Sequence, residues 1–342
     1  MKDFDINKAP SSCLLSDGKH SFAISKWVSP KRTRSYPFER VFNTLHISKK
    51  ITVIPIVKDE GARGDRDFIQ WDTVSLMSLL DVFVIFAYYD KAEVNQRNKL
   101  KITNQQFDND YVISKIKEIE QYHSSALHWN LNELNSNLHN IIDKTKTAYT
   151  EIEQKTGVKL HNFAGLDNFK EKIGEDVSQF MTFSRDKAEK AQSREIVTQQ
   201  PKESLSTLSK AKITIINYLG GQYFFTVDEI LLTVNKVCLI ESKHSKNSIL
   251  PSKGDIKDGL LKMILYSNLF NVTVNDKQTT SEAVLNLTSS KLKGAINSES
   301  TEKELTGFFE INHFSTSQEE LIRTVIAESK ANNFTVKIQF SK

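Results

Sequence analysis

Two stretches in the second half of the chain decide the predicted fold. Residues 223–232 read YFFTVDEILL, and residues 236–245 read KVCLIESKHS. Both are short runs rich in strand-forming residues, and such runs predict buried strands. The second run ends in a charged pair, Glu241 and Lys243, and an acidic pair lies in the first run. We therefore expect two neighbouring strands that bring carboxylates and a lysine together.

These residue types in this order suggest a metal site. Charged side chains are rarely buried without a partner, so Glu241 and Lys243 at the end of an apolar run need an explanation. Carboxylates from adjacent strands can hold Mg²⁺, a hard cation that takes oxygen ligands. Successive strand residues face opposite sides, so only one of Asp228 and Glu229 can join Glu241, and we favour Asp228. The alternative is a plain salt bridge from Lys243 to Glu241 or Asp228.

This pattern resembles the PD-(D/E)xK nuclease superfamily, in particular type II restriction endonucleases. The family pattern is an acid, a variable gap, then Glu or Asp, any residue, and Lys. Asp228 matches the first acid, Glu241 the second and Lys243 the lysine, while Val227 stands where the family often has proline. The resemblance covers residues 205–270, about a fifth of the chain.

The resemblance implies a magnesium-dependent, site-specific endonuclease that cuts double-stranded DNA. Asp228 and Glu241 would ligate the metal, and Lys243 would orient the attacking water and stabilise the developing charge. Glu203 is available as a third acid. Enzymes of this kind commonly act as homodimers. The alternatives are a repair or mobile-element nuclease of the same superfamily, and a DNA-binding protein without catalysis.

The segments around the expected strand pair have helical patterns. Residues 252–269 have apolar positions at helical spacing, and we expect the polar face of that helix to bring Lys257 and Lys262 towards the phosphate backbone. A solvated amphipathic helix is the competing interpretation. Residues 204–219 are expected to form a further helix that ends at Gly220. The resulting order is helix, strand pair, helix, as the nuclease core requires.

The N-terminal region offers a rival set of acids. Residues 50–57 and 82–89 read as buried strands with a helix at residues 71–80 between them, an order that predicts a parallel pair. A charged loop follows the first strand. The rival acids are Asp59, Glu60, Asp65, Asp67 and Asp72, with Lys58 nearby and Glu39 upstream. An exposed loop is the simpler explanation for these charges.

Basic charge is modest overall and clustered locally. The 342 residues carry 46 Lys or Arg against 42 Asp or Glu, a formal net charge of +4, which permits nucleic-acid binding. Lys31, Arg32 and Arg34 lie among aromatic residues and prolines in a segment suited to phosphate contacts. Two cysteines, Cys13 and Cys238, with no Cys/His cluster, favour neither a disulfide framework nor zinc.

The expected fold class is mixed α/β. We expect an N-terminal α/β unit at residues 1–105 that is suited to DNA recognition, a mainly helical region at residues 106–202, and a restriction-endonuclease-like core at residues 203–342, a central mixed sheet flanked by helices. The most apolar stretch, residues 74–89, is too short and too polar to span a bilayer. No secretory signal opens the chain, so we expect no membrane association and a cytoplasmic protein.

Overall fold

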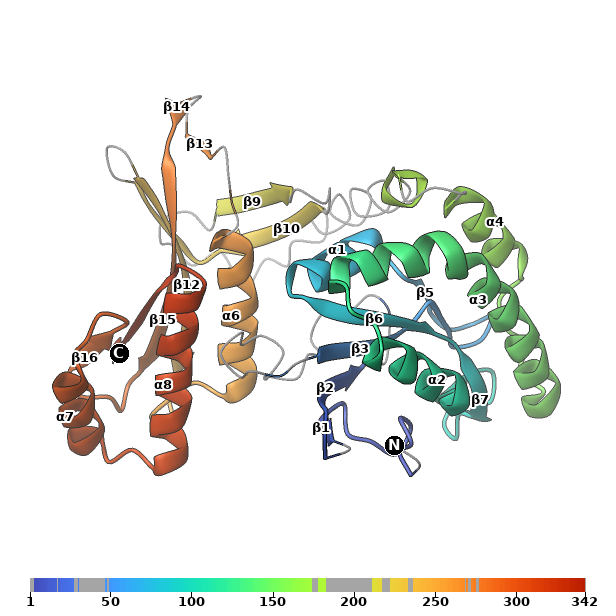
Figure 1. Cartoon of the computed structure of the whole chain (residues 1–342), viewed down its shortest axis with the longest axis horizontal. Helices are drawn as coiled ribbons and strands as arrows, with labels where there is room; N and C mark the ends of the chain where they lie inside the picture. The colour runs from blue at the N-terminus through green and yellow to red at the C-terminus, as the bar shows by residue number, and fades with distance from the viewer. Residues whose placement is uncertain are drawn as a thin grey trace. The chain divides into compact units, whose positions relative to one another are not determined.

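The computed structural model has mixed α/β architecture, as the sequence predicts (Figure 1). It describes residues 3–16, 18–27, 30, 47, 49–173, 178–182, 211–216, 222–232, 236–267, 269, 272–274 and 277–341. These residues form two compact units. Unit 1 contains the described residues through 182, and unit 2 contains those from 211 onwards.

Unit 1 is built on a four-stranded sheet in the order β1-β2-β3-β6. The strands are β1 (Ser12–Ser16), β2 (Ser21–Lys26), β3 (Lys49–Pro55) and β6 (Val82–Ala87). Strands β2, β3 and β6 run parallel, and β1 is antiparallel to β2. Helix α1 (Trp71–Leu79) lies between β3 and β6 in the chain. The parallel pair expected from the strand, helix, strand order is therefore confirmed.

Two hairpins, three helices and a short helical segment at residues 178–182 also belong to unit 1. The hairpins are β4 (Val57–Asp59) with β5 (Arg66–Phe68), and β7 (Tyr89–Val94) with β8 (Ile102–Phe107). The helices are α2 (Asn109–Glu120), α3 (Ala126–Thr156) and α4 (Ala164–Ile173). Strand β6 is buried throughout, and α3 packs against β6 and β7. Helices α2 to α4 thus belong to the same compact unit as the N-terminal strands.

Unit 2 contains a five-stranded mixed sheet in the order β11-β12-β15-β17-β16. Its strands are β11 (Glu229–Leu232), β12 (Lys236–Ser245), β15 (Thr280–Ser289), β16 (Ala295–Asn297) and β17 (Thr335–Phe340). Strands β12, β15 and β17 run parallel. The edge strands β11 and β16 are antiparallel to their neighbours.

Helices connect the parallel strands of unit 2. Helix α6 (Lys253–Ser267) joins β12 to β15 and packs against both, as Figure 1 shows. Helices α7 (Glu302–Asn312) and α8 (Thr316–Ala331) precede β17, and α8 packs against that strand. A short hairpin, β13 (Thr273–Val274) with β14 (Lys277–Gln278), lies between α6 and β15. The helix expected after the Glu241 strand is present.

The helix expected at residues 204–219 is wrong where the structure describes this segment. Residues 211–216 form strand β9 (Ala211–Ile216), which pairs antiparallel with β10 (Gln222–Val227). The sequence of β9 contains four β-branched residues, Ile213, Thr214, Ile215 and Ile216. Such residues lose side-chain freedom in a helix and are favoured in strands. The other residues of that expected helix lie outside the described part of the chain.

Candidate active site in the C-terminal unit

The β11–β12 pair places one of the two candidate first acids beside Glu241. Glu229 lies opposite Ile240 in the antiparallel register, so it shares the face of Ile240 rather than that of Glu241, and it is exposed. Asp228 lies one residue earlier, at the bend between β10 and β11. Its Oδ2 accepts a hydrogen bond from the Ser242 N–H at 3.1 Å. The structure thus brings Asp228 to the part of β12 that carries Glu241 and Lys243.

Glu241 is a buried carboxylate with a cation at each oxygen. Its side chain is 1% exposed, its Oε1 lies 2.8 Å from Lys243 Nζ, and its Oε2 lies 2.7 Å from Lys262 Nζ. Burying a carboxylate without charged or hydrogen-bonding partners is strongly unfavourable. The two ammonium groups meet that requirement from different elements, since Lys243 is on β12 and Lys262 is on α6.

A glycine lets α6 approach the strand that carries Lys243. A Cβ placed on Gly259 would lie 2.6 Å from Leu285 Cδ1 on β15, closer than real Cβ atoms come. The same Cβ would lie 3.6 Å from both Cγ and Cε of Lys243. The aliphatic part of Lys243 therefore runs along the surface of α6 at Gly259, which directs its ammonium group towards Glu241.

Tyr266 is a further residue at this site, and the sequence analysis missed it. It follows Lys262 by four residues, a spacing that puts both side chains on one face of α6. Tyr266 is 1% exposed. Burial raises the pKa of its phenol well above the usual range, and the negative charges of Glu241 and Asp228 raise it further. The sequence signal that could have indicated Tyr266 is a lysine and a tyrosine four residues apart, in the helix that follows the Glu-x-Lys strand.

The residues expected to bind phosphate do not form one group in the described part of the chain. Lys262 lies at the Glu241 carboxylate, and Lys257 is half-buried five residues earlier on α6. Lys31, Arg32 and Arg34 lie outside the described residues, as do the proposed third acid Glu203 and the rival acid Glu39.

The donor chemistry of the site suits a hard cation. Asp228 and Glu241 offer carboxylate oxygens on neighbouring segments of one sheet edge. Magnesium is commonly held by one or two carboxylates together with waters and substrate phosphates. Within the described ranges, no group of three or more His, Cys, Asp or Glu side chains is arranged to hold a metal ion. Asp228 and Glu241 are the carboxylates that would hold a magnesium ion here.

Among the rival acids of unit 1, the buried Asp59 makes structural contacts. Asp59 is 2% exposed and accepts hydrogen bonds from the Gly61 N–H at 2.8 Å and the His161 N–H at 3.3 Å. His161 Nδ1 lies 2.9 Å from the same carboxylate, and Arg66 Nε lies at 3.7 Å. The Asp59 carboxylate thus fastens the loop after β4 to the segment that follows α3.

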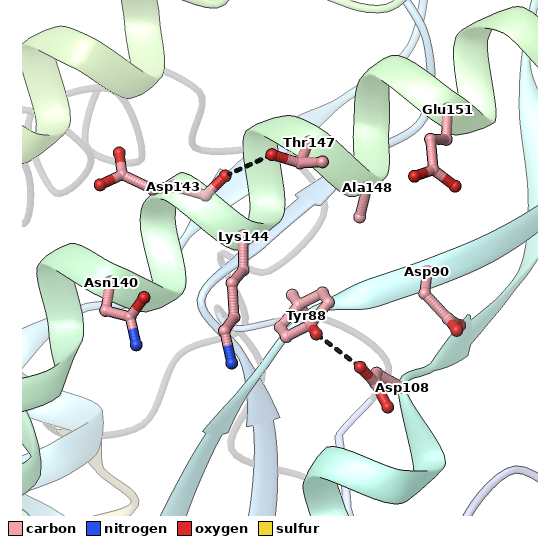
Figure 2. Close-up of a pocket in the computed structure, with 9 residues that line it drawn as sticks. All are labelled: Tyr88, Asp90, Asp108, Asn140, Asp143, Lys144, Thr147, Ala148 and Glu151. Atoms are coloured by element: carbon pink, nitrogen blue, oxygen red, sulfur yellow. Dashed lines mark hydrogen bonds between the residues drawn. The ribbon is translucent and has the colours of Figure 1, made fainter.

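A pocket of about 440 Å³ lies elsewhere in unit 1 (Figure 2). It lies between α3 and the strand segments that contain Tyr88 and Asp90, and Tyr88 donates a 2.5 Å hydrogen bond to Asp108 at the start of α2. Four carboxylates and one lysine line it: Asp90, Asp108, Asp143, Glu151 and Lys144. A lining with this excess of negative charge repels phosphate groups, so the pocket does not suit a nucleic-acid backbone.

Comparisons with known proteins identify no family for this chain. The chain matches no protein-family model, no curated protein and no solved structure. None of the helices in the described ranges has the length and apolar character needed to cross a bilayer.

Proposed function

We propose that the protein is a magnesium-dependent endonuclease that hydrolyses phosphodiester bonds in double-stranded DNA. The observation that carries the proposal is that Asp228, Glu241 and Lys243 lie together along the C-terminal half of β12, with the Lys243 ammonium 2.8 Å from the Glu241 carboxylate. Two carboxylates can hold a metal ion for metal-assisted hydrolysis, and a lysine beside them can offset charge on the substrate.

Each residue has a defined role in this proposal. Asp228 and Glu241 would hold the metal through their carboxylate oxygens. A bound Mg²⁺ would supply a Lewis acid that polarises the phosphate and lowers the pKa of a coordinated water. The Lys243 ammonium orients the attacking water and offsets the negative charge that develops on the phosphate. Burial and the charges of the two carboxylates raise the pKa of Tyr266, so its phenol stays protonated beside the site.

The wider proposal follows the resemblance to type II restriction endonucleases and its restriction-endonuclease-like core in unit 2. It assigns target recognition to the N-terminal strands and the helices of the middle region, a homodimer as the active form, and the cytoplasm as the place of action. The mixed sheet of unit 2, with α6 after the Glu241 strand, agrees with this proposal, whereas the segment expected to form the preceding helix is strand β9 at residues 211–216. The opposing interpretation is a non-catalytic protein in which Glu241 and its two lysines form a buried ion cluster.

Cleavage of plasmid and phage DNA in the presence of Mg²⁺ tests the proposal. We expect discrete fragments from the wild type, and none from Glu241→Gln or Lys243→Ala. The control is Glu229→Gln, which removes a neighbouring exposed carboxylate on the other face of the sheet edge and should cut like the wild type.

Each other outcome points to a different conclusion. Fragments that survive both site substitutions would move the active site away from β12. The absence of wild-type cleavage on varied DNA, with salt-dependent DNA binding intact, would favour the non-catalytic interpretation.

A further inference from the structure

The two lysines at Glu241 give the site a balanced charge without a metal ion. At their formal charges, Asp228 and Glu241 contribute two negative charges, and Lys243 and Lys262 contribute two positive ones. Both oxygens of Glu241 are already at contact distance from an ammonium group. A divalent cation that binds this carboxylate therefore meets a positive charge at either oxygen.

The two lysines reach Glu241 from different elements, and the stem of Lys243 packs against α6. The stem of Lys243 runs along Gly259 on α6, where a Cβ would be within 3.6 Å of two of its carbons. Lys243 is thus positioned between its own strand and the helix. Lys262 approaches from α6 and ends at Oε2, the oxygen that Lys243 leaves uncovered. The side chains of Lys243 and Lys262 are 20% and 21% exposed, whereas Glu241 is 1% exposed, so solvent reaches both lysine side chains and the carboxylate is covered.

We propose that Lys262 is a positioning residue that acts as an exchangeable counter-ion for Glu241. It holds the carboxylate in place in the metal-free protein, and it competes with a divalent cation for Oε2. Lys262 thereby sets the metal affinity of the site. This inference rests on the proposed metal site and adds a regulatory role for a residue outside the Asp228, Glu241 and Lys243 set.

Electrostatics gives the direction of the effect. Replacing Lys262 by an uncharged residue removes the group that occupies Oε2 and also removes a like charge beside the incoming cation, and both changes favour metal binding. A purely structural salt bridge would make the opposite prediction. In that case, loss of Lys262 would loosen Glu241 and weaken metal binding or leave it unchanged.

Isothermal titration of the full chain with Mn²⁺ and with Mg²⁺ tests the proposal, with DNA cleavage measured in parallel. We expect Lys262→Met to bind either metal on the order of tenfold more tightly than the wild type. Lys262→Arg, which keeps the charge, should bind no more tightly than the wild type. Glu241→Gln in the Lys262→Met background should remove the gain.

The matched control is Lys253→Met. Lys253 is an exposed lysine in the first turn of the same helix, so this variant loses the same charge far from Glu241 and should retain wild-type affinity. Lys262→Gln, which keeps a hydrogen-bond donor for Glu241, replaces the Met variant if the latter fails to fold. Circular dichroism and melting curves without metal verify the fold of each variant.

The outcomes separate this inference from the proposed function. Equal affinities for Lys262→Met and Lys253→Met, or a weaker Lys262→Met, overturn the counter-ion role even if DNA is cut. Tighter binding that depends on Glu241, in a protein that cuts no DNA, supports the counter-ion role and rejects the nuclease. If neither the wild type nor Lys262→Met binds metal, both are rejected.

Discussion

Asp59 in unit 1 and Glu241 in unit 2 are both almost fully buried carboxylates on strands, and both have basic neighbours. Their partners differ in kind. Asp59 accepts hydrogen bonds from two backbone N–H groups, those of Gly61 and His161, as well as contacts from side chains. The charged partners of Glu241 are the ends of two lysine side chains.

This difference separates a structural acid from a candidate catalytic one. Backbone N–H groups are fixed by the fold, so a carboxylate oxygen that accepts from one keeps that partner unless the segment unfolds locally. Both oxygens of Asp59 are held in this way, Oδ1 by Gly61 and Oδ2 by His161, whereas the Ser242 N–H holds Oδ2 of Asp228. Lysine side chains rotate about several bonds and reach water, so a cation or a substrate group can replace them. A buried acid alone therefore does not mark an active site. The mobility of the groups that neutralise it is the more informative feature.

The largest expected effect is on activity. Glu241→Gln should lower magnesium-dependent DNA cleavage by a factor of about 10³ or more, because charge stabilisation by a bound metal is worth several kcal/mol. Asp59→Asn should leave cleavage per folded molecule unchanged. Initial rates on plasmid DNA, normalised to the folded fraction, measure both. If Asp59→Asn lost cleavage and Glu241→Gln did not, Asp59 would be the catalytic acid and Glu241 the structural one.

The next largest effect is on stability, and here the substitution of Asp59 should cost more than that of Glu241. Asp59→Ala should lower the free energy of unfolding of unit 1 by about 3–5 kcal/mol, because it leaves the buried Arg66 guanidinium without its counter-ion. Glu241→Gln should cost less, about 1–2 kcal/mol, since both lysines can turn towards water. Equal losses would show that the two acids have the same structural role.

The tryptophans give a probe for this measurement. The chain has three tryptophans, and Trp27, Trp71 and Trp129 all lie buried in unit 1. Tryptophan fluorescence during urea denaturation therefore follows unit 1. Circular dichroism follows both units.

A smaller effect is expected at the glycine beside each acid. Gly61 has φ +109°, and a Cβ there would lie 2.8 Å from the Leu100 carbonyl oxygen, so Gly61→Ala should cost about 3 kcal/mol. Gly259→Ala meets the side chain of Leu285, which can shift, and should cost about 1–2 kcal/mol. Urea denaturation measures both costs.

The control for the glycine pair is Gly307→Ala on α7. A Cβ there would have no atom within 4 Å, so the substitution should stabilise the helix by about 0.5–1 kcal/mol. If Gly259→Ala behaved like this control, α6 would not approach β15 as closely as described.

The smallest effect is expected at Glu229. Glu229→Gln should change the free energy of unfolding by less than about 0.5 kcal/mol, since the residue is exposed, whereas Asp228→Asn should abolish cleavage. The pair of variants, assayed together, decides which acid belongs with Glu241. Cleavage that depends on Glu229 and survives Asp228→Asn would contradict the β11–β12 register, in which Glu229 lies opposite Ile240.

Several elements could be predicted from the sequence because their signals are local. The strand that ends in Glu241 and Lys243 is an apolar run, and α6 has apolar residues at helical spacing. The order of strand, helix and strand was enough to predict that β3 and β6 are parallel. Helix α7 was missed, although Thr301 and Glu304 form a capping box that is visible as a Thr-x-x-Glu pattern.

The sequence by itself determined which residues carry the charge pattern of the candidate site, the α/β class and the alternation that separates Asp228 from Glu229. Only the tertiary structure decided that Lys262 lies at Glu241, that Tyr266 is buried where the charges of both carboxylates act on it, and that Asp59 is held by backbone groups. The physical reason is that periodicity states which residues share a face of a strand or helix. Which face meets which neighbour depends on packing between segments far apart in the chain, such as α6 against β12 and β15 through Gly259.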